Sequence, residues 1–193
     1  MDQDRDSPAH RSRGRWASAA AVVAFSALVA GCGGGSPSAS GTAGRAATLL
    51  HQGLAAQRTG RFAQADAAYL GVVKLDHANV YAWYNLGVIA EHRGDASTAS
   101  YDYRQAVAAD PRYVPALYNL ATVQAATNPA AAVLAYEAVV KLAPNDAAAH
   151  FNLGLALEAT GQVAQGRSEI DRAVALDPGL AARARSATTA PQP

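Results

Sequence analysis

The chain has a single cysteine, Cys32, and this is the residue whose chemistry is easiest to state. A thiolate is a nucleophile, and small neighbours leave it open to an enzyme cleft. Cys32 follows Val29-Ala30-Gly31 at the end of an uncharged stretch that begins at Trp16 and contains AAAVVAFSALVA. The basic run HRSRGR precedes this stretch, and the combination is a secretory signal pattern. The apolar part is shorter than the roughly 20 residues that a spanning helix needs.

The sequence Val29-Ala30-Gly31-Cys32 resembles a lipobox, the processing motif of bacterial lipoproteins. This resemblance implies that the Cys32 thiol receives a diacylglycerol and that the chain is cut just before it. Residues 1–31 would be a lipoprotein signal peptide, and residues 32–45 the lipidated cysteine with a Gly/Ser-rich tether. A second acyl chain strengthens such an anchor greatly. We therefore expect a lipid anchor in a bacterial cell membrane, facing the extracytoplasmic side; otherwise Cys32 is only a small apolar residue.

The other residues that could do chemistry do not form a recognisable site. The sequence has no phosphate-binding G-x-x-x-x-G-K-[ST] loop and no G-x-S-x-G motif. The sequence repeats at steps of 33 or 34 residues, and His150 falls at the position that Trp83 and Leu117 hold in other repeats. We therefore interpret it as a packed histidine. We expect no enzyme activity, no cofactor and no metal centre, because four histidines fall at four different positions of the repeat: His51, His77, His92 and His150.

These residues lie on a sequence that repeats. YNLG at 84–87 returns as YNLA at 118–121 and FNLG at 151–154, at steps of 34 and 33 residues. Apolar and small residues at i, i+3, i+4 and i+7 predict one helix, a Gly-Asp turn follows, and a second helix ends before Asp-Pro. In the clearest unit the positions that carry this pattern are Trp83, Leu86, Gly87, Ala90, Ala99, Tyr103 and Ala106.

This pattern resembles the tetratricopeptide repeat, with W-x2-L-G in the first helix, then alanine and an aromatic residue, then proline. The resemblance implies an all-α, right-handed superhelix of four antiparallel helix pairs. The four units cover residues 46–79, 80–113, 114–146 and 147–180. A short extension, 181–193, is expected to form at most about two helical turns before a disordered end, and to leave the outer side of the last unit partly apolar.

In this family the concave groove is lined by one stripe of the first helices, with an asparagine row beside it. Aromatic residues on the stripe would be rigid anchors for a bound protein segment. Asparagines at repeat intervals could bond a bound backbone, as in the asparagine ladder of some members, or could only pack and cap local backbone. The predicted groove residues are Tyr81, Tyr84, Asn85, Val88, Glu91, Tyr118, Asn119, Thr122, Phe151, Asn152 and Leu155.

The distribution of charge along the chain restricts the classes of partner that we expect. The first 31 residues carry four Arg and three Asp, so the rest of a chain of net charge +1 is formally neutral. A neutral domain gives no electrostatic reason to expect nucleic-acid binding. No Lys or Arg falls on the stripe, where Glu91 and Glu158 are the charged residues. We therefore expect an uncharged or weakly basic, partly apolar protein segment as the partner.

The favoured function is a membrane-anchored interaction scaffold or adaptor that binds a protein segment in the groove, in envelope assembly or secretion. Two alternatives remain open at this point. One is a structural array that self-associates, as a homo-oligomer, through the weakly capped last unit. The other is an accessory subunit of a cell-envelope enzyme.

Overall fold

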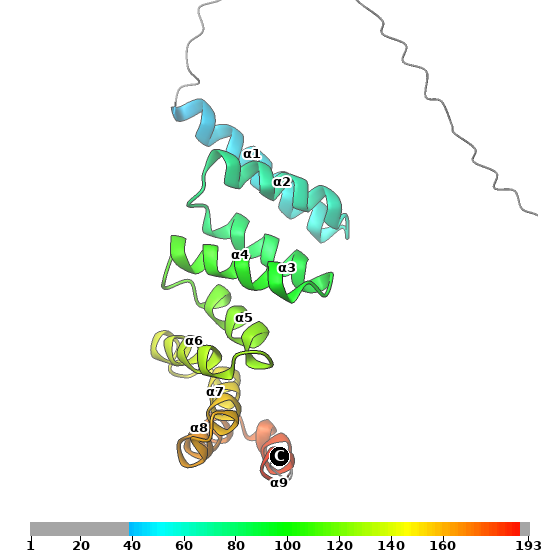
Figure 1. Cartoon of the computed structure of the whole chain (residues 1–193). Helices are drawn as coiled ribbons and strands as arrows, with labels where there is room; N and C mark the ends of the chain where they lie inside the picture. The colour runs from blue at the N-terminus through cyan, green and yellow to red at the C-terminus, as the bar shows by residue number, and fades with distance from the viewer. Residues whose placement is uncertain (1–38, 190–193) are drawn as a thin grey trace, which may run out of the picture. The chain divides into compact units, whose positions relative to one another are not determined.

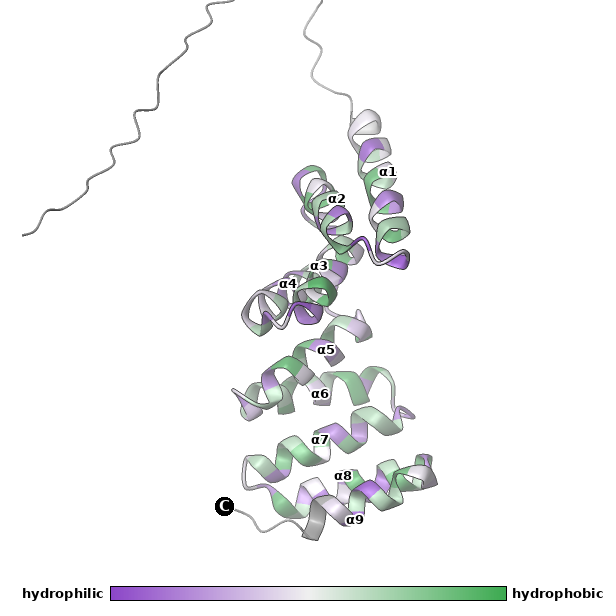
Figure 2. Cartoon of the chain, turned by 90° about the vertical axis from the view of Figure 1, so that its right-hand side faces the viewer, coloured by the Kyte–Doolittle hydropathy of each residue, from purple (hydrophilic) through white to green (hydrophobic). Residues whose placement is uncertain are grey.

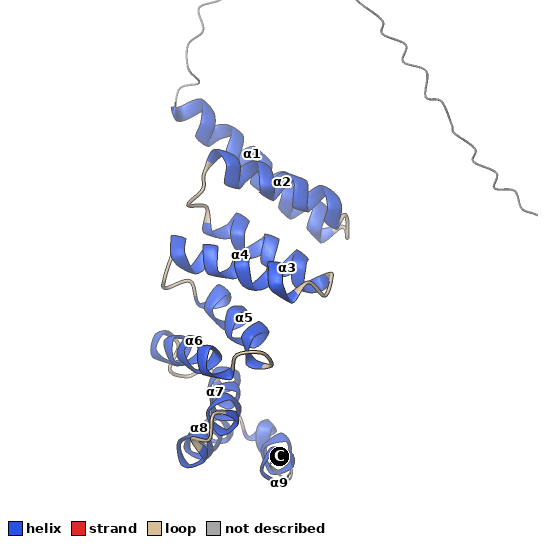
Figure 3. Cartoon of the chain, in the orientation of Figure 1, coloured by secondary structure: helices blue, strands red, loops and turns tan. Residues whose placement is uncertain are grey.

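The computed structural model of the chain describes residues 39–189. Within this range the chain is helical and contains no strand (Figure 1, Figure 3), which confirms the all-α prediction. The predicted signal peptide, residues 1–31, and Cys32 lie outside the described residues. The elements are α1 (Ala39–Arg58), α2 (Phe62–Leu75), α3 (Val80–His92), α4 (Ala96–Ala109), α5 (Val114–Ala125), α6 (Pro129–Leu142), α7 (Ala147–Ala159), α8 (Val163–Leu176), the 3₁₀-helix η1 (Pro178–Leu180) and α9 (Ala181–Thr189).

The helices pack in sequence order. The pairs are α1 with α2, α3 with α4, α5 with α6 and α7 with α8. Each second helix also contacts the first helix of the next pair, so the four pairs form a solenoid (Figure 1). Figure 2 shows that each of these eight helices carries both hydrophobic and hydrophilic residues. Such helices bury one side against a neighbouring helix and leave the other in water.

Glycine sets three of the four turns inside the pairs. Gly60, Gly94 and Gly161 have φ values of 72°, 76° and 83°, a left-handed conformation that residues with a Cβ rarely adopt. The third turn uses Asn128 instead. Its side chain accepts a hydrogen bond from the N–H of Ala131, and Pro129 begins α6. The shorter third turn therefore replaces a left-handed glycine with a cap and a proline.

Inside the pairs, a small residue of the first helix faces a buried ring of the second. A Cβ on Gly87 would lie 2.6 Å from ring carbons of Tyr103, and one on Gly53 would lie 2.5 Å from the ring of Tyr69. Both tyrosines are fully buried. The repeat of small residue and aromatic residue in the sequence thus sets how closely the two helices approach.

The fourth pair is built differently, because Ile170 replaces the tyrosine. There the backbones themselves come close: a Cβ on Gly154 would lie 2.6 Å from the carbonyl oxygen of Gly166. Both glycines are buried. Without a ring between them, α7 and α8 pack almost backbone against backbone.

The structure corrects two predicted boundaries. Residues 39–45, which belong to the predicted tether 32–45, form the beginning of α1. Ala46 is buried in the cluster on which Leu75 of α2 also packs, so this end of α1 has a neighbouring helix to pack against. The C-terminal extension, for which the sequence predicts about two helical turns before a disordered end, is helical as far as Thr189. It packs through Leu180 and Ala184 on the last repeat.

Candidate binding groove

The predicted groove residues lie on α3, α5 and α7, the first helices of repeats two to four. Their exposure divides them into three groups. Tyr81, Glu91 and Thr122 are exposed; Tyr84, Val88, Tyr118, Asn119, Asn152 and Leu155 are half-buried; and Asn85 and Phe151 are buried. The most exposed aromatic side chain of the stripe is therefore Tyr81 on repeat two, at 57%.

Three tyrosines form a cluster at this place. The ring of Tyr113 meets Tyr81 edge-on at a centroid distance of 5.7 Å and Tyr84 at 5.4 Å. Tyr84 also lies 5.9 Å from Tyr103 of α4. Such perpendicular pairs are favoured by the charge distribution of aromatic rings and hold them rigid. We name Tyr81, Tyr84 and Tyr113 the tyrosine cluster.

Sequence reasoning missed Tyr113, since it precedes α5 and falls outside the stripe. Its signal is its place directly before a first helix, in Asp110-Pro111-Arg112-Tyr113. Its ring contacts Tyr84, the stripe aromatic of the same unit, so Tyr113 extends the groove beyond the stripe.

The asparagine side chains already have acceptors within the chain. Asn85 donates to the carbonyl of Tyr81 at 2.7 Å, inside its own helix. Asn119 donates to the Tyr103 hydroxyl at 3.1 Å and Asn152 to the Tyr118 hydroxyl at 2.8 Å. The second two bonds join one repeat to the next. These contacts match the packing and capping role; bonds from the asparagines to a bound backbone stay a prediction.

The buried tyrosines of the second helices hold the groove residues from below. Tyr69 donates to Gln57 at 2.7 Å, Tyr103 donates to Glu91 at 2.7 Å, and the Tyr136 hydroxyl lies 2.9 Å from that of Thr122. Burial raises the pKa of Tyr69 to about 12 and, with the bond to Glu91, raises that of Tyr103. Both hydroxyls therefore keep their protons at neutral pH and act as donors.

A pocket of about 270 Å³ opens on the stripe between repeats three and four. It is lined by Thr122, Tyr136, Asn152 and Leu155, with alanines around them. The alanines and Leu155 make its wall mainly apolar, and the hydroxyls and the amide add polar groups. A pocket of this size and lining suits one aliphatic side chain of a bound segment.

The structure corrects the prediction for Phe151. This residue is 2% exposed, whereas its equivalents Tyr84 and Tyr118 are half-buried. Leu180 and Ala184 cover it, and the guanidinium carbon of Arg183 lies 4.8 Å from the centre of its ring. The phenylalanine is covered because the C-terminal extension is ordered. It is not an exposed anchor in this conformation.

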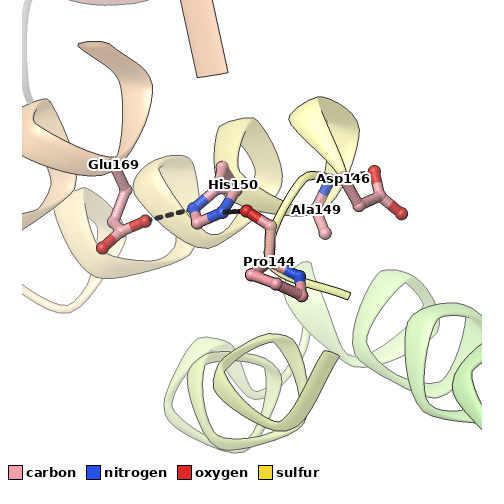
Figure 4. A network of polar contacts seen from close by, with 5 residues as sticks. All are labelled: Pro144, Asp146, Ala149, His150 and Glu169. Carbon is pink, nitrogen blue, oxygen red and sulfur yellow. Dashed lines mark hydrogen bonds and ion pairs between the residues drawn. The ribbon is translucent and has the colours of Figure 1, made fainter. Parts of the chain in front are cut away.

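His150 has the packed role that the sequence predicts (Figure 4). Its Nε2 lies 3.0 Å from the carbonyl oxygen of Pro144, and its Nδ1 lies 2.6 Å from Glu169 of α8. Trp83 makes the equivalent bond, from Nε1 to the carbonyl six residues before it. Since a carbonyl can only accept, Nε2 carries the proton of that bond. His150 thus replaces tryptophan and adds a link from α7 to α8.

Residues 39–189 contain neither a candidate metal site nor a candidate membrane-spanning helix. No three His, Cys, Asp or Glu side chains in this range are placed to share a metal ion. None of the helices there combines the length and apolar character that crossing a bilayer requires.

Comparison with known families matches the tetratricopeptide repeat model to residues 50–114 and 122–181, more than half of the chain. The chain belongs to the tetratricopeptide repeat family. Its helix pairs are therefore the repeats of a tetratricopeptide solenoid. A search of curated proteins finds no match.

Solved structures share the fold. A crystal structure of MamA superposes with a TM-score of 0.63 at 25% identity, covering 71% of this chain and 81% of that one. MamA 41-end from Desulfovibrio magneticus RS-1 gives 0.64 at 25% identity, covering 69% and 76%. YrrB, described as a TPR protein with an unusual peptide-binding site, gives 0.65 at 23% identity, covering 68% of each chain. At that identity the likeness to YrrB concerns the fold alone.

Proposed function

We propose that this protein is a membrane-anchored adaptor whose groove holds a segment of another protein. The observation that carries this proposal is the tyrosine cluster on the inner stripe. Tyr81 presents an exposed ring that meets the ring of Tyr113 edge-on. A rigid aromatic residue loses little conformational entropy when a partner binds, and such residues dominate binding hot spots.

The charges and side chains of the groove restrict which kinds of protein segment can bind in it. The stripe has no lysine or arginine, so it offers no cation for a C-terminal carboxylate or a phosphate. Glu91 is exposed at the end of α3 and is held by the Tyr103 hydroxyl. An anionic segment would meet this carboxylate without compensation. We infer that the guest is uncharged or weakly basic, with an aliphatic side chain for the pocket beside Thr122 and Leu155.

The anchor is part of the proposal and rests on the sequence Val29-Ala30-Gly31-Cys32. Lipidation of Cys32 would place the adaptor on the extracytoplasmic side of a bacterial membrane, in envelope assembly or secretion. Expression of the native chain and a Cys32→Ser variant in a bacterium tests this. We expect the native chain in the membrane fraction, with the mass of a diacylated protein that begins at Cys32. A native chain that retains residue 1 without lipid would refute the anchor.

The groove is tested by replacing Tyr81 and Tyr84 with alanine and identifying proteins crosslinked to the chain in its native host. Tyr101→Ala is a matched control, because Tyr101 is a tyrosine of similar exposure, 50%, on the second helix α4. We expect one or more crosslinked partners to be lost by the groove variant and kept by the control. Equal capture by both variants would show that the tyrosine cluster does not bind them.

A further inference from the structure

The C-terminal helix α9 does not dock as the first helices of the repeats do. The third residue of α3, α5 and α7 is an alanine with 0% exposure: Ala82, Ala116 and Ala149. The third residue of α9 is Arg183, which is exposed. An arginine side chain cannot enter a space that closes around a methyl group. The helix therefore takes a different position on the last repeat.

In that position α9 covers a groove residue. Leu180 and Ala184 pack on the buried cluster of Phe151, Ile170 and Ala173. The Arg183 guanidinium carbon lies 4.8 Å from the centre of the Phe151 ring, within the range of a cation–π contact. An apolar contact and a cationic contact thus hold one helix over the stripe of repeat four.

The charge of Arg183 also acts on a side chain of repeat three. Burial raises the pKa of Tyr118, the charge of Asp146 raises it further, and the charge of Arg183 acts in the opposite direction. Tyr118 is the stripe aromatic of repeat three. The charges of Asp146 and Arg183 therefore act on the Tyr118 hydroxyl in opposite directions, while the ring contact of Arg183 is with Phe151.

The contacts that hold α9 are few. None of the described side chains of residues 181–186 is buried. The helix has nine residues, fewer than a helix needs to be stable alone in water. It is joined to α8 by Pro178 and Gly179, which belong to η1. Segments with few buried apolar contacts open at low free-energy cost, so α9 can leave its site without unfolding the repeats.

We propose that the surface around Phe151, on the stripe of repeat four, is a docking site for a short basic helix of a partner protein, and that α9 occupies it until that partner displaces it. The sequence Leu180-Ala181-Ala182-Arg183-Ala184 defines the chemistry: a cation beside small apolar residues. This inference rests on the proposed function and assigns the last groove site of the same surface. It also accounts for an aromatic groove residue that is buried in the free chain.

Two substitutions of the full chain separate occupancy from other effects. Ala184→Asp places a carboxylate against Phe151, whereas Ala182→Asp places the same group two residues earlier, on the exposed side of the same helix. The probe is a fluorescent synthetic peptide with the sequence of residues 177–189, and the measurement is its anisotropy. We expect the peptide to bind Ala184→Asp at least tenfold more tightly than the native chain or Ala182→Asp.

Hydrogen exchange controls for folding. Ala184→Asp should lose amide protection in α9 and keep it in α7 and α8; Arg183→Glu is the second variant if α7 also loses protection. Equal peptide affinity for the three chains would overturn the inference, and so would no binding to the displaced variants at about 1 mM peptide, the effective concentration of a short tether. Equal binding of a peptide with Arg183→Glu would overturn the basic character of the partner. Since the probe is the chain's own sequence, failure here leaves the crosslinking result at Tyr81 and Tyr84 unaffected.

Discussion

Replacing Gly154 with alanine should destabilise the fourth repeat, although alanine is the better helix former. Gly154 lies within α7, and in an open helical position the substitution would gain about 1 kcal/mol. Here the new Cβ would lie 2.6 Å from the carbonyl oxygen of Gly166 and 3.1 Å from the backbone nitrogen of Ile170. These are backbone atoms, and no side-chain rotation can move them away.

The size of the effect follows from the distances. Ordinary van der Waals contact begins at 3.4 Å, so α7 and α8 must separate by about 0.8 Å, which forfeits a quarter to a half of the attraction at the contact. Overpacking of this kind costs about 1–3 kcal/mol in well-packed cores. Because the obstacle is backbone, we place the overpacking cost at the upper end, about 3 kcal/mol, which leaves a net loss of about 2 kcal/mol after the gain in helix propensity.

Urea denaturation with hydrogen exchange of α7 and α8 measures this loss, because repeat arrays need not unfold in one step. Gly44→Ala is the matched control: it makes the same change within a helix, with nothing within 4 Å of the new Cβ. We expect it to raise stability by up to about 1 kcal/mol. A Gly154→Ala chain as stable as the native chain would refute the close approach of the two helices.

Three further predictions concern single side chains. Burial, with nearby carboxylates, raises the pKa of Asp102 from 3.8 to about 6. Neutral Asp102 therefore leaves the fold at full stability below pH 3.8, and this stability is lost as the pH rises through 6 and the carboxylate ionises. Asp102→Asn should have a free energy of unfolding up to about 3 kcal/mol above that of the native chain at about pH 8. Urea titrations should show this gain vanish near about pH 3.5. Tyr103→Phe removes the bonds to Glu91 and from Asn119 and should cost about 1–3 kcal/mol, and a double-mutant cycle with Glu91→Ala should show coupling. Asn128→Ala removes the cap of α6 and should lower stability by about 1 kcal/mol in thermal unfolding, with no effect if the cap is not formed in solution.

The repeated core was predictable because each of its positions has one physical requirement. Gly87 leaves the space that the Tyr103 ring fills, and Trp83 donates from its indole to a carbonyl before the helix. His150 could be assigned to packing for the same reason, since it occupies the position of that tryptophan. Patterns that recur at a fixed period predict the elements that are built in the same way each time.

The ends of the array follow no such period, and there the prediction was wrong. Helix α1 begins at Ala39, inside the predicted tether, where no repeat pattern extends. Phe151 matches its equivalents in sequence, and only the path of η1 and α9 determines that it is covered. Tyr113 was missed because it lies between helices, where a helical stripe does not extend.

The hydroxyl contacts of Asn119 and Asn152 have a consequence for how fast a guest could leave. Each ties a first helix to the repeat before it, so the spacing between successive aromatic rows is fixed before any guest arrives. A surface whose spacing is already set loses little conformational entropy when a guest binds. It favours guests whose side chains have the matching spacing. Guests of equal composition but different spacing should therefore differ mainly in dissociation rate.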